Sequence, residues 1–398
     1  MNDIKNYFDL LLYRNKIIEC YYSIYNDYKI LTPFSLDSKE DITLDFVNCT
    51  ICGAKDNISN NKVGENYILS QPCLRNNHID ALKDKNNKTN YMGYFTMLGG
   101  FCYINNKDNW IQKFNEIILK QFTFFRTIYK DNIIKLTIPM QYKEYLPLTE
   151  ETKEKLLNNN CQILYSDIDE KNLKWKYGIE GVQGYGTRWE IAGLKKSFVN
   201  CGNDIVLFKN DKAIGIDFGS GLETLVSVLN GEEHLLYSNI VCSDLIKKFC
   251  KGNQNNEKLI DCLTSLLCIE HYKEYYNFRI KYLKYMYIKI ISAICIINNI
   301  SEEFLILLIN DICKNIGIKN NKKNIPIINT IKNQKQYLYD ISFYKNIEKL
   351  VNTYEETKNI YSLRGYKKNI SYIEIEALKF IREKEKRDEK AKKVKKRG

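Results

Sequence analysis

The sequence predicts an α+β fold in which an antiparallel sheet is flanked by helices and is followed by an all-helical region. Short β-rich runs separated by Asn-, Gly- and Lys-rich turns occupy residues 42–231, and few of them alternate with helices as parallel units would. Beyond residue 231 the strand patterns largely stop, and long stretches repeat apolar residues at helical spacing. We therefore expect two domains, residues 1–231 and residues 232–398, the second helical with a basic C-terminal tail.

The elements of the first domain follow from these patterns in order. Residues 4–28 keep apolar side chains at helical spacing and predict an opening helix, and further helices are expected near residues 108–128 and 149–159. Strands are predicted for ITLDFVNCTI (42–51), YFTMLGGFCYI (94–104), IIKLTIPM (133–140), CQILYS (161–166), DIVLF (204–208) and AIGIDF (213–218). Hairpin-like spacing between them predicts antiparallel pairing.

The composition is that of a globular chain with an excess of positive charge. Hydrophobic residues make up 44% and charged residues 27%, which is enough to build a core. The net charge of +12 favours an anionic partner, first a nucleic acid and second a membrane surface. The chain is also rich in Lys, Asn, Ile and Tyr, as AT-rich codons would produce, so codon bias accounts for part of this excess.

Cysteine usage and hydropathy indicate a cytoplasmic protein. The thirteen cysteines form no framework and no secretory leader is recognised, so free thiols in a reducing compartment are expected. Residues 285–300 are the most apolar stretch, but Lys289 and the short length favour a buried helix over a membrane span. Cys49 and Cys52 form a C-x-x-C without a second pair, so we expect core and turn residues and no zinc.

Four motifs follow one another along the first domain. The first is LTPFSLDSKEDITLDFVNCTICGAKDNI (31–58), and the second is SQPCLRNNHID (70–80) with YFTMLGGFCYI (94–104). The third, WKYGIEGVQGYGTRWEI (175–191), is a Gly-rich segment followed by an acidic residue, and the fourth is GIDFGSGLETLVSVLNG (215–231). Each motif alone is weak evidence for a protein family, whereas four motifs in a fixed order and at characteristic separations are specific evidence.

These motifs resemble the catalytic core of the alanyl-tRNA synthetase family, a class II aminoacyl-tRNA synthetase family. They are similar, in turn, to the family's opening segment with its TNAGM-like turn, its motif 2 strands, its W-x-x-G-x-x-G-x-x-G loop and its motif 3. The resemblance covers about residues 5–231, and 398 residues leave no room for the family's editing and C-terminal domains. It implies a cut-down, divergent relative that uses ATP and Mg²⁺ to activate an amino acid as an aminoacyl adenylate.

The resemblance also implies roles for three side chains. Arg75 would be the catalytic residue that grips the α-phosphate of ATP and a carboxylate oxygen, a task that suits a planar guanidinium. Asp217 would bind the amino group of the amino acid, and Trp175 would form a wall of the same pocket. The structural alternatives are an Arg75–Asp80 surface pair, an Asp217 that caps a helix or pairs with a core lysine, and a Trp175 that is simply core.

Further positions are implied around the nucleotide. Gly184 would line the substrate pocket, and Gly219 and Gly221 would let the backbone approach ATP before a helix N-terminus. Glu190 and Glu223 would contact ATP and hold Mg²⁺, since hard oxygen ligands suit that ion. Either carboxylate is equally compatible with a structural ion pair.

The sequence departs from the family at several charged positions. Thr224 stands where motif 3 has an Arg that stacks on adenine and meets the γ-phosphate, and residues 90–96 lack the second Arg and the Glu of motif 2. Arg188, Lys195 or Lys196 are candidates to replace the missing charge. The amino acid is therefore not fixed as alanine.

Three functions remain open on the sequence alone. The first is an enzyme that activates an amino acid with ATP and passes it to tRNA or another carrier, within or outside translation. The second is a non-catalytic or regulatory module that binds tRNA or an aminoacylated ligand, and the third is an aminoacyl transferase that does not use ATP. The helical domain sits where the family has its acceptor-stem-binding helices. The tail, residues 382–397, would contact RNA phosphates or form a solvated helix end.

Overall fold

The computed structural model describes residues 7–36, 46–75, 92–105, 107–167, 173–193, 198–231, 235–250, 253–272, 278–317, 324–342, 351–352, 354, 356–357 and 372–395. The chain divides into two compact units. The first unit comprises Met1–Leu74 and Phe95–Ile240, and the second comprises Arg75–Tyr94 and Val241–Gly398. The domain boundary predicted after residue 231 thus lies a few residues before this division, and residues 75–94 group with the helices.

The first unit is built on a sheet with ten strands in the described part of the chain. Their order is β1-β2-β3-β10-β9-β8-β4-β5, with β7 beside the second half of β9 and β6 beside β7. The strands are β1 Lys29–Ile30, β2 Tyr67–Leu74, β3 Tyr94–Tyr103, β4 Ile134–Pro139, β5 Cys161–Ser166, β6 Lys174–Lys176, β7 Val182–Gly186, β8 Arg188–Ala192, β9 Phe198–Lys209 and β10 Lys212–Gly221.

The predicted α+β class, a sheet flanked by helices with a helical C-terminal region, is confirmed. The sheet itself is mixed rather than purely antiparallel. The β3, β10, β9, β8 and β4 strands pair antiparallel, whereas β1 with β2 and β4 with β5 are parallel. The second parallel pair arises because helix α5, Glu150–Asn158, carries the chain back across the sheet, as a parallel connection requires.

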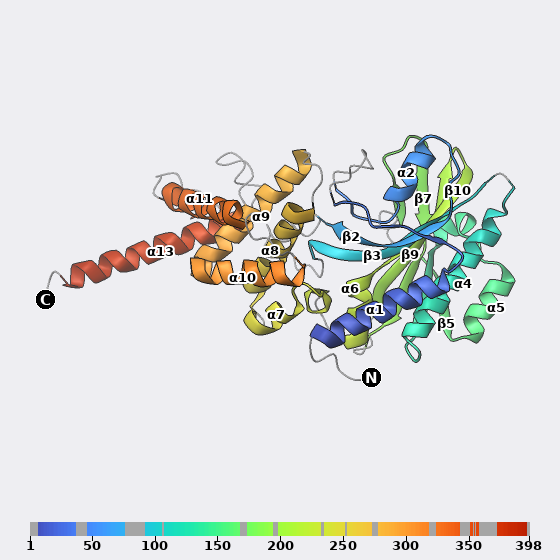
Figure 1. The fold of residues 1–398 in the computed structure, drawn as a ribbon, viewed down its shortest axis with the longest axis horizontal. Helices are drawn as coiled ribbons and strands as arrows, with labels where there is room; N and C mark the ends of the chain where they lie inside the picture. The colour runs from blue at the N-terminus through green and yellow to red at the C-terminus, as the bar shows by residue number, and fades with distance from the viewer. Residues whose placement is uncertain are drawn as a thin grey trace. The chain divides into compact units, whose positions relative to one another are not determined.

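Helices α1, Tyr7–Ile24, and α4, Trp110–Ile128, cover one face of the sheet, which we call the first face (Figure 1). Helix α4 begins where the Asn109 side chain accepts the amides of the first turn, as a helix N-cap does. Its buried aromatic side chains, such as Phe125, pack with Tyr21 of α1, Trp189 of β8 and Phe218 of β10. This is the larger of the two cores of the unit, and it accounts for the predicted helices near 4–28 and 108–128.

Helix α2, Cys52–Ser59, lies on the opposite, second face (Figure 1). Its N-cap residue Ile51 and its buried side chains Ala54 and Ile58 belong to a smaller core with strand residues of that face, among them Phe101. The strand predicted for residues 42–51 is therefore wrong in its described part: residues 46–51 form bends and turns that lead into α2. The spacing of three and four residues between Ile51, Ala54 and Ile58 is the helical signal that the sequence carries for α2.

The predicted Gly-rich loop is a β-hairpin, β6 and β7, followed directly by β8. Gly178 and Gly181 have φ of 71° and 73°, a conformation that glycine adopts without strain, and they form the turn between β6 and β7. After β10 the chain enters α6, Leu222–Asn230, which ends at Gly231 in the left-handed region. Two short 3₁₀ segments, η1 Met140–Tyr145 and η3 Leu235–Ser238, complete the unit.

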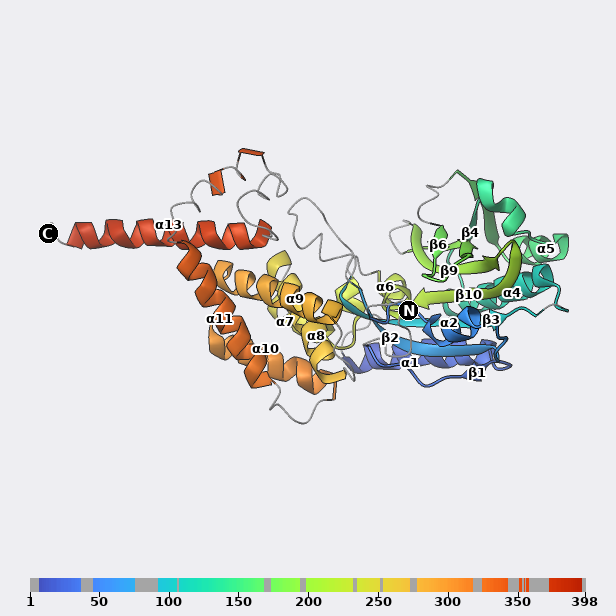
Figure 2. The same ribbon diagram turned by 90° about the horizontal axis from the view of Figure 1, so that it is seen from above.

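The described part of the second unit from residue 241 onward is built of helices. Its helices are α7 Ser243–Phe249, α8 Gln254–Tyr272, α9 Phe278–Ile297, α10 Glu302–Asn315, α11 Asn324–Ser342 and α13 Tyr372–Lys395. Helix α9 packs against α8, α11 and α13 (Figure 2). A buried ion pair joins Lys289 of α9 to Glu374 of α13 at 2.9 Å, so the lysine that interrupts the apolar stretch has a partner inside the unit.

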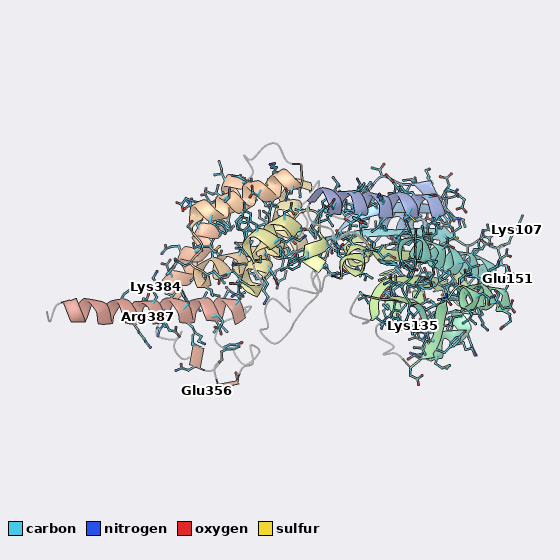
Figure 3. All side chains as sticks on the ribbon, turned by 90° about the horizontal axis from the view of Figure 1, so that it is seen from below. Lys107, Lys135, Glu151, Glu356, Lys384 and Arg387 are labelled. Carbon is cyan, nitrogen blue, oxygen red and sulfur yellow. The ribbon has the colours of Figure 1, made fainter. Side chains whose placement is uncertain are left out.

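No helix in the described ranges has the length and apolar character that crossing a membrane demands. The thirteen cysteines are free thiols. Helix α13 carries exposed residues of both signs, including Lys384 and Arg387, along its outer part (Figure 3). The side chains beyond Asp388 lie outside the described residues, so the role of the basic tail stays a prediction.

Candidate functional site

Asp217 lies on β10, inside the sheet of the first unit. Its neighbours across the strands are Phe101 on β3 and Ile205 on β9. Because Ile216 and Phe218 point into the first-face core, the alternation of the strand places Asp217 on the second face. The side chain is 8% exposed, so a carboxylate is held almost out of contact with water.

Two side chains from distant segments partner this carboxylate. The Tyr177 hydroxyl, just after β6, donates a hydrogen bond to Asp217 Oδ2 at 3.2 Å. Lys55 of α2, also buried, contributes a positive charge. Burial raises the pKa of Asp217 to about 7, against the lowering effects of the Tyr177 hydrogen bond and the Lys55 charge. A carboxyl group with such a pKa responds strongly to the arrival of another cation.

Sequence reasoning did not find Tyr177 or Lys55. Tyr177 stands between two motif positions, Trp175 and Gly178, and only the curl of the hairpin brings its hydroxyl to β10. Lys55 follows the TNAGM-like turn, where no helix was predicted, so its place on a helix above the sheet was not foreseen. The possibility that Asp217 pairs with a core lysine was raised, and Lys55 is the lysine that fits it.

Gly184 and Trp175 are directly paired across β6 and β7. A Cβ on Gly184 would lie 2.6 Å from Ile205 Cγ2 and 2.9 Å from the Tyr177 ring. A Cβ on Gly186 would lie 2.5 Å from the Trp175 ring. The two glycines thus make room for the two aromatic rings, and Gly184 supports Tyr177 beneath Asp217. Trp175 is partly buried and packs against the second-face core, so its proposed role in a substrate pocket stays a prediction.

Gly219 and Gly221 precede helix α6, as the motif predicts. Gly219 is opposite Gly99 of β3 and lies on the second face with Asp217. Gly221 caps α6 with an extended backbone, φ of −73°. Thr224 is in the first turn of this helix, partly buried, and offers no cation. The helix therefore supplies backbone amides and a favourable dipole to an anion, and no charged side chain of the family's kind.

The two carboxylates predicted to hold Mg²⁺ each have protein partners. Glu190 Oε2 lies 3.0 Å from Lys135 Nζ and accepts the Thr137 hydroxyl at 2.8 Å. Glu223 is buried and its Oε2 accepts the Thr96 amide at 2.9 Å, and burial raises its pKa against the charge of Arg14 and this hydrogen bond.

A Mg²⁺ ion would have to displace those partners, so the residues as arranged do not form a ready metal site. The structure does not bring Glu190 and Glu223 together around a common centre. Among the described residues, no group of three or more His, Cys, Asp or Glu side chains is arranged to hold a metal ion. The Mg²⁺ role of either residue stays a prediction.

Arg75 follows the last residue of β2 and belongs to the second unit. Its amide donates to the Gly93 carbonyl at 2.9 Å, and the Tyr287 hydroxyl of α9 donates to the Arg75 carbonyl at 3.5 Å. The Gly93 amide in turn donates to buried Asp261 of α8 at 2.9 Å. The helices thus hold both ends of the segment that carries Arg75. Its catalytic role stays a prediction.

Arg188 begins β8 on the second face, because Trp189 and Ile191 point into the first-face core. It was raised as a substitute for the missing motif 3 charge, and it lies on the same face as Asp217 and Gly219. The other two substitutes, Lys195 and Lys196, lie outside the described residues.

No protein-family model matches the chain, and no curated protein matches it. The solved structures to which the chain is similar include three synthetase structures. The apo histidyl-tRNA synthetase of S. aureus is 12% identical, with a TM-score of 0.35 over 56% of this chain and 66% of that chain. The asparaginyl-tRNA synthetase of Entamoeba histolytica with asparaginyl-adenylate is 10% identical, with a TM-score of 0.33 over 59% and 66%.

A third similar structure is titled the RNA binding domain of threonyl-tRNA synthetase from Cryptosporidium parvum Iowa II. It is 14% identical, with a TM-score of 0.34 over 56% of this chain and 64% of that chain. The chain therefore spans just under two thirds of the length of each of these structures.

The side chains and backbone of the second face have a defined binding chemistry. A buried carboxylate with a hydroxyl donor is a binding site for a primary ammonium group, which would compete with Lys55 for Asp217. A glycine-lined strand end and a helix N-terminus follow Asp217 along the chain, and they suit an anion.

Proposed function

We propose that this chain activates an amino acid with ATP, as an enzyme of the aminoacyl-tRNA synthetase type, and passes the aminoacyl group to tRNA or another carrier. The observation that carries the proposal is the burial of Asp217 beside Tyr177 on the glycine-lined face of the sheet. A buried acid has a high energetic cost that nearby cations reduce, and the substrate ammonium would be a second cation at Asp217 beside Lys55.

The proposed reaction divides between positioning and charge. Asp217 binds the substrate ammonium, and Tyr177 orients the Asp217 carboxylate through its hydrogen bond. The carboxylate of the bound amino acid then faces the nucleotide. A carboxylate oxygen then forms a bond to the α-phosphorus of ATP as the bond from that phosphorus to the pyrophosphate oxygen breaks. Arg75 would neutralise the charge that develops there. The aminoacyl group next passes to a hydroxyl or other nucleophile of the carrier, and AMP leaves.

The carrier proposed first is tRNA, and the charge distribution supports it. In residues 241–398, Lys and Arg outnumber Asp and Glu by 32 to 18, whereas in residues 1–240 they number 28 against 30. The positive excess of the chain therefore belongs to its helical part, which codon bias across the whole chain does not explain. A concentrated basic excess is typical of binding to phosphate backbones.

A non-catalytic binding module is the second candidate, and specific observations favour it. Asp217 already has Lys55 and Tyr177 as partners, Glu223 is engaged by the Thr96 amide, and Thr224 replaces a cation. A domain of this fold that has lost the adenylation activity would keep such structural contacts. An aminoacyl transferase that does not use ATP is the third candidate, because it never needs the γ-phosphate contact.

Amino-acid-dependent ATP–pyrophosphate exchange over the twenty standard amino acids separates these candidates. We expect exchange with one or a few amino acids, and its loss in Asp217→Asn and Arg75→Ala. Asp211→Asn, an exposed change in the same unit, is the matched control and should retain exchange. Absence of exchange with every amino acid, together with intact tRNA binding, would establish the module instead.

A further inference from the structure

Arg188 stands in a row of residues that crosses the second face. Its partner on β4 is Thr137, and Trp189 next to it pairs with Gly202 of β9. The Thr187 amide donates to the Asp204 carbonyl at 2.9 Å, so Arg188 lies opposite Asn203. Asn203 pairs in turn with Gly219 of β10. Arg188, Asn203 and Gly219 therefore lie side by side across three strands.

This row is next to the row that contains Asp217. Asp217 is two residues before Gly219 on the same strand and on the same face. With strands about 4.8 Å apart and a rise of about 3.4 Å per residue, the Cα atoms of Arg188 and Asp217 are roughly 12 Å apart. When two Cα atoms are that far apart, the guanidinium of one residue and the carboxylate of the other can hold the two ends of one small dipolar ligand.

The Arg188 guanidinium has no protein partner within the described ranges. It makes no hydrogen bond or ion pair there, and its Nε is buried without an acceptor. The other arginines that the first unit describes are engaged: Arg126 donates to four backbone carbonyls and Arg14 donates to the Thr96 hydroxyl. Burying the Arg188 Nε without an acceptor is costly, because this donor has lost water and gained no partner.

The neighbourhood of Arg188 explains why a ligand, rather than a side chain, would satisfy it. Glu190, the acid on the same strand and face, is already held by Lys135 and Thr137. Asn203 directs its amide nitrogen to the Thr187 carbonyl at 2.7 Å, and Gly219 has no side chain. Arg188 therefore lies in a row beside a residue without a side chain. Glu190 and Asp217, the acids that β8 and β10 place on this face, already have partners of their own.

We infer that Arg188 is an anion-binding residue of the Asp217 site, which takes a phosphate or carboxylate group of the ligand whose ammonium Asp217 holds. The inference rests on the proposed function for that ammonium, and it supplies a cation that Thr224 does not. The fork of the guanidinium suits two oxygens of a phosphate or carboxylate at once.

Calorimetric titration of the full chain with inorganic pyrophosphate tests this without requiring turnover. At physiological salt, which screens surface charges, we expect Arg188→Ala to weaken pyrophosphate binding at least tenfold and Arg188→Lys to weaken it less. Lys107→Ala, which removes one exposed positive charge of the same unit (Figure 3), is the matched control and should change the affinity less than twofold. Circular dichroism establishes whether each variant is folded. If Arg188→Ala does not fold, the affinity of Arg188→Lys for pyrophosphate alone decides the test.

A second arm distinguishes the two anions. If the amino acid found in the exchange assay binds more weakly to Arg188→Ala while pyrophosphate does not, the anion is the substrate carboxylate and the inference stands. Equal affinities of Arg188→Ala and Lys107→Ala for both probes overturn it, as does a wild-type chain that binds neither. Loss of pyrophosphate binding in Arg188→Ala, in a chain without exchange activity, retains the anion site and rejects the proposed enzyme.

Discussion

The Asp204→Asn substitution is predicted to stabilise the first unit, and increasingly so as the pH rises. Asp204 of β9 is fully buried on the first face, where its Oδ2 accepts hydrogen bonds from Trp189 Nε1 and the Thr187 hydroxyl. Its Oδ1 has no hydrogen-bond partner among the described residues, and neither does the buried Tyr21 hydroxyl. Burial raises the pKa of Asp204 from its ordinary value of 3.8 to about 7, against these two hydrogen bonds.

The sign of the effect follows from this shift. The folded protein binds the proton of Asp204 more tightly than the unfolded chain, so stability is fully present below pH 3.8 and falls as the pH rises through 7. At about 1.4 kcal/mol per pKa unit, the loss is roughly 1.5 kcal/mol near pH 5 and about 4 kcal/mol above pH 8. Asparagine does not titrate, so the advantage of Asp204→Asn grows by about 2–3 kcal/mol over that range.

Urea unfolding followed by tryptophan fluorescence measures this advantage. The three tryptophans, Trp110, Trp175 and Trp189, all belong to the first unit, so the signal reports on that unit. Asp211→Asn is the matched control, since Asp211 is exposed in the β9–β10 turn at a φ of 62° that asparagine tolerates. Parallel stability curves of wild type and Asp204→Asn from about pH 5 to pH 8 would show that folding does not raise the pKa of Asp204.

Three further outcomes are expected. Tyr177→Phe raises the pKa of Asp217 further, because it removes a hydrogen bond that favours the ionised form, and carboxyl NMR titration measures the change. Gly184→Ala lowers the stability of the first unit by about 1–3 kcal/mol in urea unfolding, because its Cβ would lie 2.9 Å from the Tyr177 ring. Asp261→Ala accelerates hydrogen exchange of the Gly93 amide, which mass spectrometry with fragmentation detects, because that amide loses its acceptor.

Each of these outcomes has a control or a contrary result. An unchanged Asp217 pKa in Tyr177→Phe would mean that the hydroxyl contact is not maintained in solution. Gly221→Ala places a Cβ 3.1 Å from the side chain of its own helix residue Thr224, and it should cost less than Gly184→Ala. Ser292→Ala removes a buried hydrogen bond of α9 instead of α8, and it should leave the hydrogen exchange of the Gly93 amide unchanged. Equal exchange in both variants contradicts the role of Asp261.

Much of the fold follows from local patterns that the sequence carries. The helical patterns of residues 4–28 and 149–159 predict α1 and α5, and residues 161–166 form the expected β5. The parallel pairs at the two ends of the sheet were not predicted, because they depend on which distant strands meet and not on any single segment. The strand expected through residues 46–51 failed because these residues, although rich in apolar and β-branched side chains, form bends and turns that lead into α2.

The sequence identified Asp217 and the glycines of the candidate site, but it did not identify Tyr177 and Lys55, the partners of Asp217. Asp217 stands out because it interrupts an apolar strand, a property of adjacent residues. Tyr177 reaches it from a hairpin forty positions earlier, so its role depends on the register of β6, β7, β9 and β10. The face on which Arg188 lies depends on the same register, and a shift of one residue in β8 would reverse it. Long-range register is the information that one sequence does not display.

The proposed activation of an amino acid is tested most directly by acid-quenching the full chain with ATP and each amino acid, and detecting the product by mass spectrometry. We expect an aminoacyl adenylate with wild type and with Asp211→Asn, and none with Asp217→Asn. Tight binding of ATP or tRNA without an adenylate from any amino acid would contradict this expectation.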